Sequence, residues 1–342
     1  MMDFGIDWEM WRGKFGGQFD IFKRKTIGTA AQRTVSLPDF YGVSLPQENL
    51  NSNENVGLEL ALNTNGQIGQ INYRAALSAT YTRFRQTYIE SENTKLYKSS
   101  MNYWQSCTLN RWSNARSASL YHWAGGQFTS LDAASNSLVM YETGKDSNGN
   151  RDIVPGMYKI DDRDGDGYIT SADNYFTWGD GNPPLQFGLN MSASYKKLDV
   201  SLVFSGAALK RKSLGLSSYA GFGYLYQLPK MYSEDCWSVK NYGADPWDPN
   251  TEWNSGYWPA LVRVKQSGSG HNATYTSNQP YNFVNATYLR LKTLEVGYRV
   301  SPDFIRKAGI KSVRLAFNAG NLFTLCNKNL KFVDPESTDN GR

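Results

Sequence analysis

The chain of 342 residues is 20% charged and 14% aromatic, whereas a typical soluble protein is about 25% charged, so its composition favours β structure with long loops. No segment approaches the roughly 18 consecutive apolar residues of a membrane-spanning helix, which excludes a helical membrane protein. The net charge of +5 is scattered, with short basic clusters only at residues 23–25 and 210–212, which argues against nucleic-acid binding and predicts solvated or headgroup-facing loop ends there.

The N-terminal residues predict a pair of strands at 4–11 and 18–27, turning about Gly13 and Gly16-Gly17. The first eight residues lack a basic stretch followed by an apolar core, so they do not form a secretory signal. The chain is therefore expected to be either cytoplasmic or a piece of a longer protein.

Strict alternation of apolar and polar residues predicts the next strands, because residues two apart lie on one face of a strand. Alternation runs from Val56 to Asn63 and again from Ile71 to Thr82, and Asn63-Thr64-Asn65-Gly66 predicts the turn between them. A second pair covers residues 187–195 and 198–205, with a tight turn at Lys196-Lys197.

The C-terminal part predicts two further strands, at residues 289–298 and 313–319. In the first of them the apolar phase shifts after Leu291 and resumes at Leu294. Such a shift predicts a β-bulge near Thr293.

The connections between the eight predicted strands alternate in length along the chain. Short connections are expected at residues 12–17, 64–70, 196–197 and about 300–311, and long ones at 28–52, 83–183 and 208–283. Outer-membrane barrels sort their connections in this way, with short periplasmic turns and long extracellular loops. A soluble antiparallel sheet with one wet face is the alternative, but it would have shorter loops.

The fold class predicted is therefore all-β: part of an antiparallel transmembrane β-barrel with strands of about ten residues. Eight strands are too few to account for two loops of more than about 70 residues, which favours a segment of a larger barrel. The last residues form no amphipathic strand ending in an aromatic residue, so both ends of the barrel are expected to be missing.

Residues 162–173 form the most specific chemical motif, since they match the twelve-residue calcium loop with carboxylates at positions 1, 3 and 5 and glycine at position 6. Gly167 permits the sharp reversal, and Ile169 is expected to anchor the loop to a core. Position 12 carries an aspartate where the EF-hand has glutamate, and no helix precedes the loop. A structural Ca²⁺ ion is predicted, with these ligands: Asp162, Asp164, Asp166, the Tyr168 carbonyl, Thr170 and Asp173. An Asp/Gly-rich turn that binds nothing is the alternative.

Several motifs, spread over nearly the whole chain, resemble the SusC/RagA-type TonB-dependent transporters of Bacteroidota outer membranes. They are Asn55-Val56-Gly57-Leu58-Glu59-Leu60, Pro155-Gly156 before the acidic loop, Gly181-Asn182-Pro183-Pro184, Phe187-Gly188-Leu189-Asn190, Tyr288-Leu289-Arg290-Leu291-Lys292, Val296-Gly297-Tyr298, Asn321-Leu322-Phe323-Thr324 and Val333-Asp334-Pro335-Glu336. Residues 83–153 match the family poorly.

The resemblance implies a 22-stranded barrel with an N-terminal plug, which imports oligosaccharides or peptides under a SusD-like surface lipoprotein with energy relayed by TonB. Residues 1–342 would be the C-terminal part of that barrel, without the plug domain and the final strand. By itself such a chain is not expected to transport anything. A secreted or surface calcium-stabilised carbohydrate-binding β protein is the alternative function.

The sequence contains no catalytic set of residues, so the protein is not expected to be an enzyme. Eight of the ten tryptophans lie in the expected long loops, where packing among loop residues is the simpler expectation than stacking on sugars, and no substrate-binding residue is assigned. Cys107 and Cys236 could pair outside the cell, but free, half-buried thiols are the favoured expectation.

Overall fold

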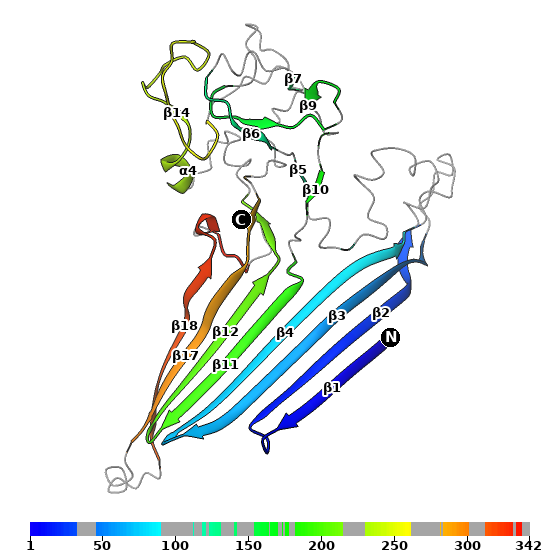
Figure 1. Cartoon of the computed structure of the whole chain (residues 1–342), viewed down its shortest axis with the longest axis vertical. Helices are drawn as coiled ribbons and strands as arrows, with labels where there is room; N and C mark the ends of the chain where they lie inside the picture. Colours follow the sequence, from blue (N-terminus) through cyan, green and yellow to red (C-terminus); the bar gives the residue numbers. More distant parts are fainter. Residues whose placement is uncertain are drawn as a thin grey trace.

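Eight long strands form one antiparallel sheet in the order β1-β2-β3-β4-β11-β12-β17-β18 (Figure 1). The computed structural model describes residues 1–32, 46–89, 112, 118–120, 123–130, 140–141, 154–163, 165–169, 173, 175–177, 182–214, 230–260, 281, 283–300, 312–330 and 333–336. The eight strands are β1 (Met2–Met10), β2 (Phe15–Gln32), β3 (Gln47–Ile68), β4 (Ile71–Tyr88), β11 (Leu185–Tyr195), β12 (Leu198–Ala208), β17 (Tyr288–Arg299) and β18 (Arg314–Cys326). The predicted number of strands is confirmed.

The strands near the N-terminus are longer than predicted, and this moves one turn. β3 has 22 residues and β2 and β4 have 18 each, instead of about ten. The Asn63-to-Gly66 segment predicted as a turn continues β3, with Asn63 opposite Ala76 and Gly66 opposite Tyr73. The chain reverses at Gly69, whose φ of 61° lies in the left-handed region that glycine tolerates, so the turn prediction was wrong by a few residues.

The predicted connections fare differently. The connection predicted at 28–52 is shorter, because β2 continues to Gln32 and β3 begins at Gln47, and residues 301–311 lie outside the described part of the chain. The β11–β12 hairpin turns at Lys196-Lys197, as expected, and the first hairpin turns between Met10 and Phe15, which leaves Gly16 and Gly17 inside β2. The pairing of β17 with both neighbours shifts register between Leu291 and Thr293, which confirms the predicted bulge. The strands pair in chain order, so successive connections lie at alternate ends of the sheet. The connections at 89–184 and 209–287 are long, as predicted, whereas 33–46 is no longer than 300–313.

The pairing registers give the sheet one apolar face and one polar face, since residues directly opposite each other in neighbouring strands share a face. Met191 pairs with Leu202, which pairs with Leu294 on the apolar face. Ser192 pairs with Ser201, which pairs with Glu295 on the polar face. The apolar face carries Leu189, Met191, Val200, Leu202 and Phe317, and the polar face carries Asn190, Ser192, Ser201 and Asn318.

Large apolar side chains remain exposed on the apolar face. Phe317 is 65% exposed, Phe4 is 62% exposed and Ile6 is 50% exposed. A soluble sheet buries such a face against another layer, whereas an outer-membrane strand turns it to lipid.

Short strands gather at one end of the sheet, opposite the β3–β4 and β11–β12 turns (Figure 1). They pair as β5 (Ala118–Leu120) with β10 (Tyr175–Thr177), β6 (Trp123–Gln127) with β8 (Tyr158–Ile160), β7 (Met140–Tyr141) with β9 (Tyr168–Ile169), β13 (Arg211–Ser213) with β16 (Phe283–Asn285) and β14 (Ser238–Val239) with β15 (Trp253–Asn254). Helix α4 (Lys230–Glu234) and the 3₁₀ turn η9 (Lys328–Leu330) are the remaining elements of the described residues. Within the described ranges, no helix has the length and apolar character needed to cross a membrane.

These connecting segments have hydrophobic cores of their own. One core gathers Val154, Met157, Ile169 and Trp237, and the other gathers Tyr158, Leu214, Trp258 and Tyr281. Trp258 is 2% exposed, and Trp247 and Trp253 pack against the first core, which fits the expectation that loop tryptophans pack among themselves. Trp104 and Trp178 lie outside the described residues.

Candidate functional site

The acidic loop predicted to bind calcium closes on its own first and last carboxylates. Asp162 accepts hydrogen bonds from the backbone N–H of Gly165 (2.8 Å) and of Gly167 (2.7 Å). Asp173 is fully buried and accepts one from the N–H of Arg163 at 2.8 Å. Gly165 and Gly167 have φ angles of 75° and 84°, so the sharp reversal predicted at Gly167 is present.

The anchor of this loop is also confirmed, whereas its metal is not tested. Ile169 is fully buried and packs in the first loop core, and residues 154–161, directly before the loop, contain no helix. Asp164 and Thr170 lie outside the described residues, and only the backbone of Tyr168 is described there. Among the described residues no group of three or more His, Cys, Asp or Glu side chains could hold a metal ion. The six-ligand calcium site therefore stays a prediction.

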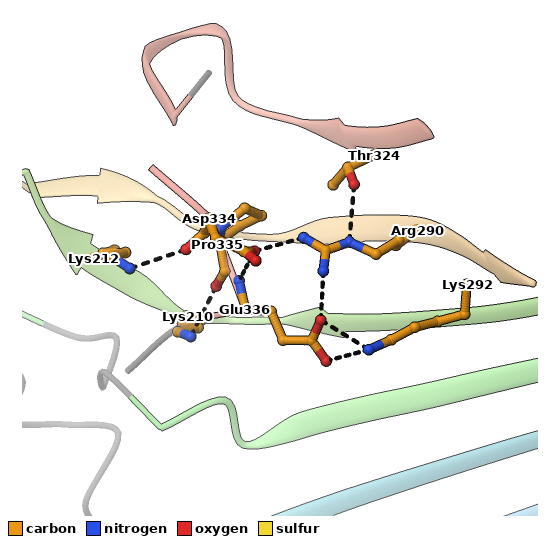
Figure 2. Close-up of polar contacts among 8 residues, drawn as sticks. All are labelled: Lys210, Lys212, Arg290, Lys292, Thr324, Asp334, Pro335 and Glu336. Carbon is orange, nitrogen blue, oxygen red and sulfur yellow. Dashed lines mark hydrogen bonds and ion pairs between the residues drawn. The ribbon is translucent and has the colours of Figure 1, made fainter. Parts of the chain in front are cut away.

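A cluster of ion pairs joins the chain's C-terminal segment to β17 (Figure 2). Arg290 donates to the Asp334 carboxylate at 2.5 Å and to Glu336 at 2.6 Å, while its Nε donates to the Thr324 hydroxyl at 2.9 Å. Lys292 reaches Glu336 at 2.8 Å. Two motifs that lie more than 40 residues apart in the sequence thus meet in one network.

The basic cluster at residues 210–212 supplies the rest of this network. Nζ of Lys210 donates to the carbonyl of Pro335, and Nζ of Lys212 donates to the carbonyl of Asp334, both at 2.9 Å (Figure 2). The two lysines are 4% and 5% exposed, so the prediction of a solvated or headgroup-facing loop end is wrong here. A lysine remains charged in a buried position only where acceptors and carboxylates surround its ammonium group, and the fold provides both.

The pKa values of Lys210 and Asp334, two members of the network that lie outside the sheet, reflect burial and the charges around them. Burial lowers the pKa of the Lys210 ammonium group, against the attraction of Asp334 and Glu336. Burial would raise the pKa of the Asp334 carboxyl, but the hydrogen bonds from Arg290 and from the Glu336 backbone, with the charges of Arg290 and Lys212, hold it below its usual range. The network therefore depends on ionised carboxylates.

A cavity of about 450 Å³ opens on the polar face of the sheet, beside Glu336. Hydroxyl and amide groups from three strands line it, and its charged wall comes from the network of Figure 2: the lining includes Ser78, Thr80, Gln186, Ser205, Lys210 and Glu336. The buried Ser205 hydroxyl has no hydrogen-bond partner among the described residues. Pro183, Phe187, Ala207 and Tyr288 add apolar groups to the lining. This mixture of polar groups and apolar surface is typical of ligand sites.

A second charged group lies on the polar face near the turn end of the sheet. The Arg314 guanidinium contacts the carboxylates of Asp199 and Glu295, from three adjacent strands. It passes over Gly297, where a Cβ atom would meet the guanidinium and the Asp199 carboxylate. A cavity of about 590 Å³ lies nearby, lined by Arg74, Asp199 and Arg299 among others.

The amino-acid sequence alone does not reveal these polar-face groups as sites. The family motifs quoted above contain Arg290, Lys292, Asp334 and Glu336, but nothing in the residues alone indicates that the two motifs meet. The alternation of apolar and polar residues along the strands predicts that Asp199 and Asn318 lie on the polar face, and this is the signal that the sequence offers for these groups. Cys236 and Cys326 are free and half-buried, as favoured, and Cys107 lies outside the described residues.

Comparison with known proteins finds similarity to TonB-dependent receptors, although no family model matches the chain. The chain is 25% identical over 344 residues to TonB-dependent receptor P3 of Formosa agariphila and 23% identical over 345 residues to TonB-dependent receptor P26 of the same organism. These alignments cover 98% and 100% of the chain, but only 30% and 31% of the two relatives.

Solved structures give the same result for the fold. The RagAB peptide importer in its closed-closed state superposes with a TM-score of 0.61 at 19% identity, over 96% of this chain and 32% of that one. The open-open state gives a TM-score of 0.61 at 17% identity, over 99% and 31%. The chain thus spans about a third of the length of the proteins it matches. Its predicted fold class, an all-β antiparallel partial barrel with long loops, is confirmed. The resemblance to SusC/RagA-type TonB-dependent receptors predicted from the motifs is therefore confirmed, in sequence along the whole chain and in fold across the sheet.

Proposed function

We propose that this chain is part of an outer-membrane TonB-dependent transporter that actively imports oligosaccharides or peptides. One observation carries the proposal: an eight-stranded sheet presents one apolar, exposed face and one polar face that holds the cavities and charged networks. Lipid outside and a polar interior require this division in a membrane barrel. A soluble carbohydrate-binding sheet, the alternative, would have to cover Phe4, Ile6 and Phe317 with another layer.

The partners of the proposed transporter follow from the resemblance. Residues 1–342 would supply the C-terminal part of a 22-stranded barrel, with a plug domain and a final strand outside this chain. A SusD-like surface lipoprotein would cover the loop end, and the TonB system would act through the N-terminal part of the whole protein. The RagAB neighbours are named as peptide importers, which supports this class of machine without assigning the cargo. The role is not catalytic.

The experiment for this proposal uses the full-length protein in its own cells. It should be recovered in the outer-membrane fraction, and labelled oligosaccharide or peptide should accumulate in a manner that deletion of the protein or loss of TonB abolishes. Recovery of the protein in the medium or the soluble fraction would contradict the proposal.

We also propose that the loop from residue 162 to residue 173 binds one structural Ca²⁺ ion. Asp162 and Asp173 are already held by amides of the loop itself, which preorganises hard oxygen ligands in the way that Ca²⁺ prefers. Four carboxylates within twelve residues would otherwise repel each other. Asp166, the Tyr168 carbonyl, Asp164 and Thr170 would supply the remaining ligands. A weak affinity, on the order of 10⁻⁴ to 10⁻³ M, is sufficient outside the cell.

The double substitution Asp164→Ala with Asp166→Ala should abolish calcium binding by this loop and leave the barrel intact, because the ion would bridge residues of one local segment. Isothermal titration of the full-length transporter with Ca²⁺ measures the loss of one site. Asp245→Ala with Asp248→Ala, in a second acidic turn, provides the matched control. An unchanged stoichiometry in the first variant would show that the loop is only a turn.

A further inference from the structure

Two rows of basic side chains cross β2, β3 and β4 on the apolar face. The pairing registers place Lys23, Val56 and Arg83 in one row, and Lys25, Glu54 and Arg85 in the next. Because directly paired residues share a face, all of these side chains lie on the same side as Ile21, Leu58 and Tyr81, which form the adjoining row.

The position of these rows along the strands matches the edge of a membrane. On β4, the residues of the apolar face run from Ile71 to Tyr81, and Arg83 is the next one in phase. Ten residue steps cover about 33 Å of strand, or about 25 Å along the membrane normal at a tilt of about 40°, which equals the usual height of the lipid-facing apolar band. The basic rows therefore begin where hydrocarbon should end, on the side of the long loops.

The side chains in these rows are held in place by two groups. The Glu54 carboxylate, 5% exposed, pairs with Arg85 at 2.9 Å and with Lys23 at 3.3 Å. The Trp112 ring lies 5.0 Å from the Arg83 guanidinium and 4.5 Å from that of Arg85. Tryptophan is enriched at the depth of lipid headgroups, which is an independent indication of the depth of the rows.

The rows are strongly cationic for a surface that faces lipid. Among the described residues, the two rows contain four basic side chains and one carboxylate, that of Glu54. Lys23 and Arg83 flank Val56, which is small and apolar, across two strand spacings of about 10 Å in total. Lys23 is 49% exposed despite its ion pair. A multivalent anion seated over Val56 would contact both cations at once.

We propose that these rows bind the phosphate groups of a phosphorylated glycolipid of the lipid A type in the outer leaflet. Lys23, Lys25 and Arg83 contact the phosphates, while Glu54 and Trp112 position Arg85 and Arg83. Charge complementarity selects this occupant, because the apolar residues below the rows hold the acyl chains of the same molecule and the cations meet its headgroup. The inference rests on the outer-membrane location given under Proposed function.

The test compares lipid A with chemically dephosphorylated lipid A, each added to the full-length receptor purified in a neutral detergent, with thermal unfolding as the readout. Phosphorylated lipid A should raise the unfolding temperature of the wild-type receptor, and the effect should weaken with added salt. Lys23→Gln with Arg83→Gln should weaken the apparent affinity about thirtyfold, since each of the two cations near an anionic lipid surface contributes about 1 kcal/mol. Glu54 keeps its Arg85 partner in this variant.

Lys14→Gln with Lys197→Gln is the matched control, because it removes two exposed cations at the turn end of the sheet and should leave the affinity unchanged. Equal affinities for the two double variants, or an equal effect of dephosphorylated lipid A, would overturn the proposal. The cells that supply the receptor are also fractionated. A receptor found outside the outer membrane would contradict the proposed function, whereas a receptor found there that does not bind lipid A would contradict only the proposal about the basic rows.

Discussion

Leu202→Arg should destabilise the full-length protein in a lipid bilayer by about 2 to 4 kcal/mol, whereas Ser201→Arg should cost less than about 1 kcal/mol. Leu202 lies in the row of Met191 and Ala75, near the middle of the apolar band, where a charge loses its water. Ser201 lies on the polar face directly opposite Glu295, so an introduced arginine would share this carboxylate with Arg314.

Urea titration of each variant folded into phosphatidylcholine vesicles measures these differences in the free energy of unfolding. The comparison controls for strand propensity and for the introduced side chain, because the two positions are adjacent on one strand and receive the same residue. Equal destabilisation at the two positions would contradict the assignment of lipid and interior faces.

Arg290→Met should release the C-terminal segment, residues 333–336, from β17. The free energy that holds this segment in place should fall by about 2 kcal/mol. Loss of one partner from a fully buried ion pair costs about 3 to 5 kcal/mol, but the Asp334 and Glu336 carboxylates are 51% and 37% exposed, so water replaces part of the lost interaction. Hydrogen exchange of residues 328–336 in the full-length protein should accelerate about thirtyfold.

Lys240→Met is the matched control, because Lys240 also pairs with a carboxylate at 2.9 Å, but both partners are exposed. Lys240→Met should lower the free energy of unfolding by less than about 0.5 kcal/mol. Unchanged exchange of residues 328–336 in Arg290→Met would show that the segment is held by packing and not by the ion pairs.

The stabilisation that the network provides should decrease as the pH falls. The folded pKa of Asp334 lies below its usual range, so its stabilising contribution is present above the unfolded carboxyl value of about 4 and is lost as the pH falls through the folded pKa. The exchange difference between wild type and Arg290→Met should accordingly shrink in acid.

The sheet could be predicted from the sequence because apolar and polar residues alternate along each strand, which identifies its two faces. The β11–β12 hairpin was predicted closely, since Lys196-Lys197 interrupts two clear alternating runs. The turn after β3 was misplaced because Asn65 and Gly66 are residues typical of turns, and only cross-strand pairing, such as Gly66 with Tyr73, keeps them in the strand. Pairing between strands is not a local property of the chain.

The charged groups were less predictable for the same reason. The 23–25 and 210–212 clusters look alike in sequence, yet Lys210 and Lys212 are buried against the C-terminal segment, whereas Lys23 lies half-exposed on the apolar face. The acidic loop was predictable because its ligand spacing, its glycine and its anchor lie within twelve residues. Contacts of residues far apart in the chain, such as Arg290 with Glu336, required the fold.

The central claim, that this sheet separates lipid from a polar interior, is tested most directly by Ser201→Cys and Leu202→Cys in the full-length protein. Each variant is reconstituted in liposomes, in a background without the native cysteines, and treated with a membrane-impermeant thiol reagent. The thiol at position 201 should react through the polar interior, while the thiol at position 202 should be spared because it faces lipid. Equal labelling at both positions would contradict the account and favour a soluble sheet with both faces in water.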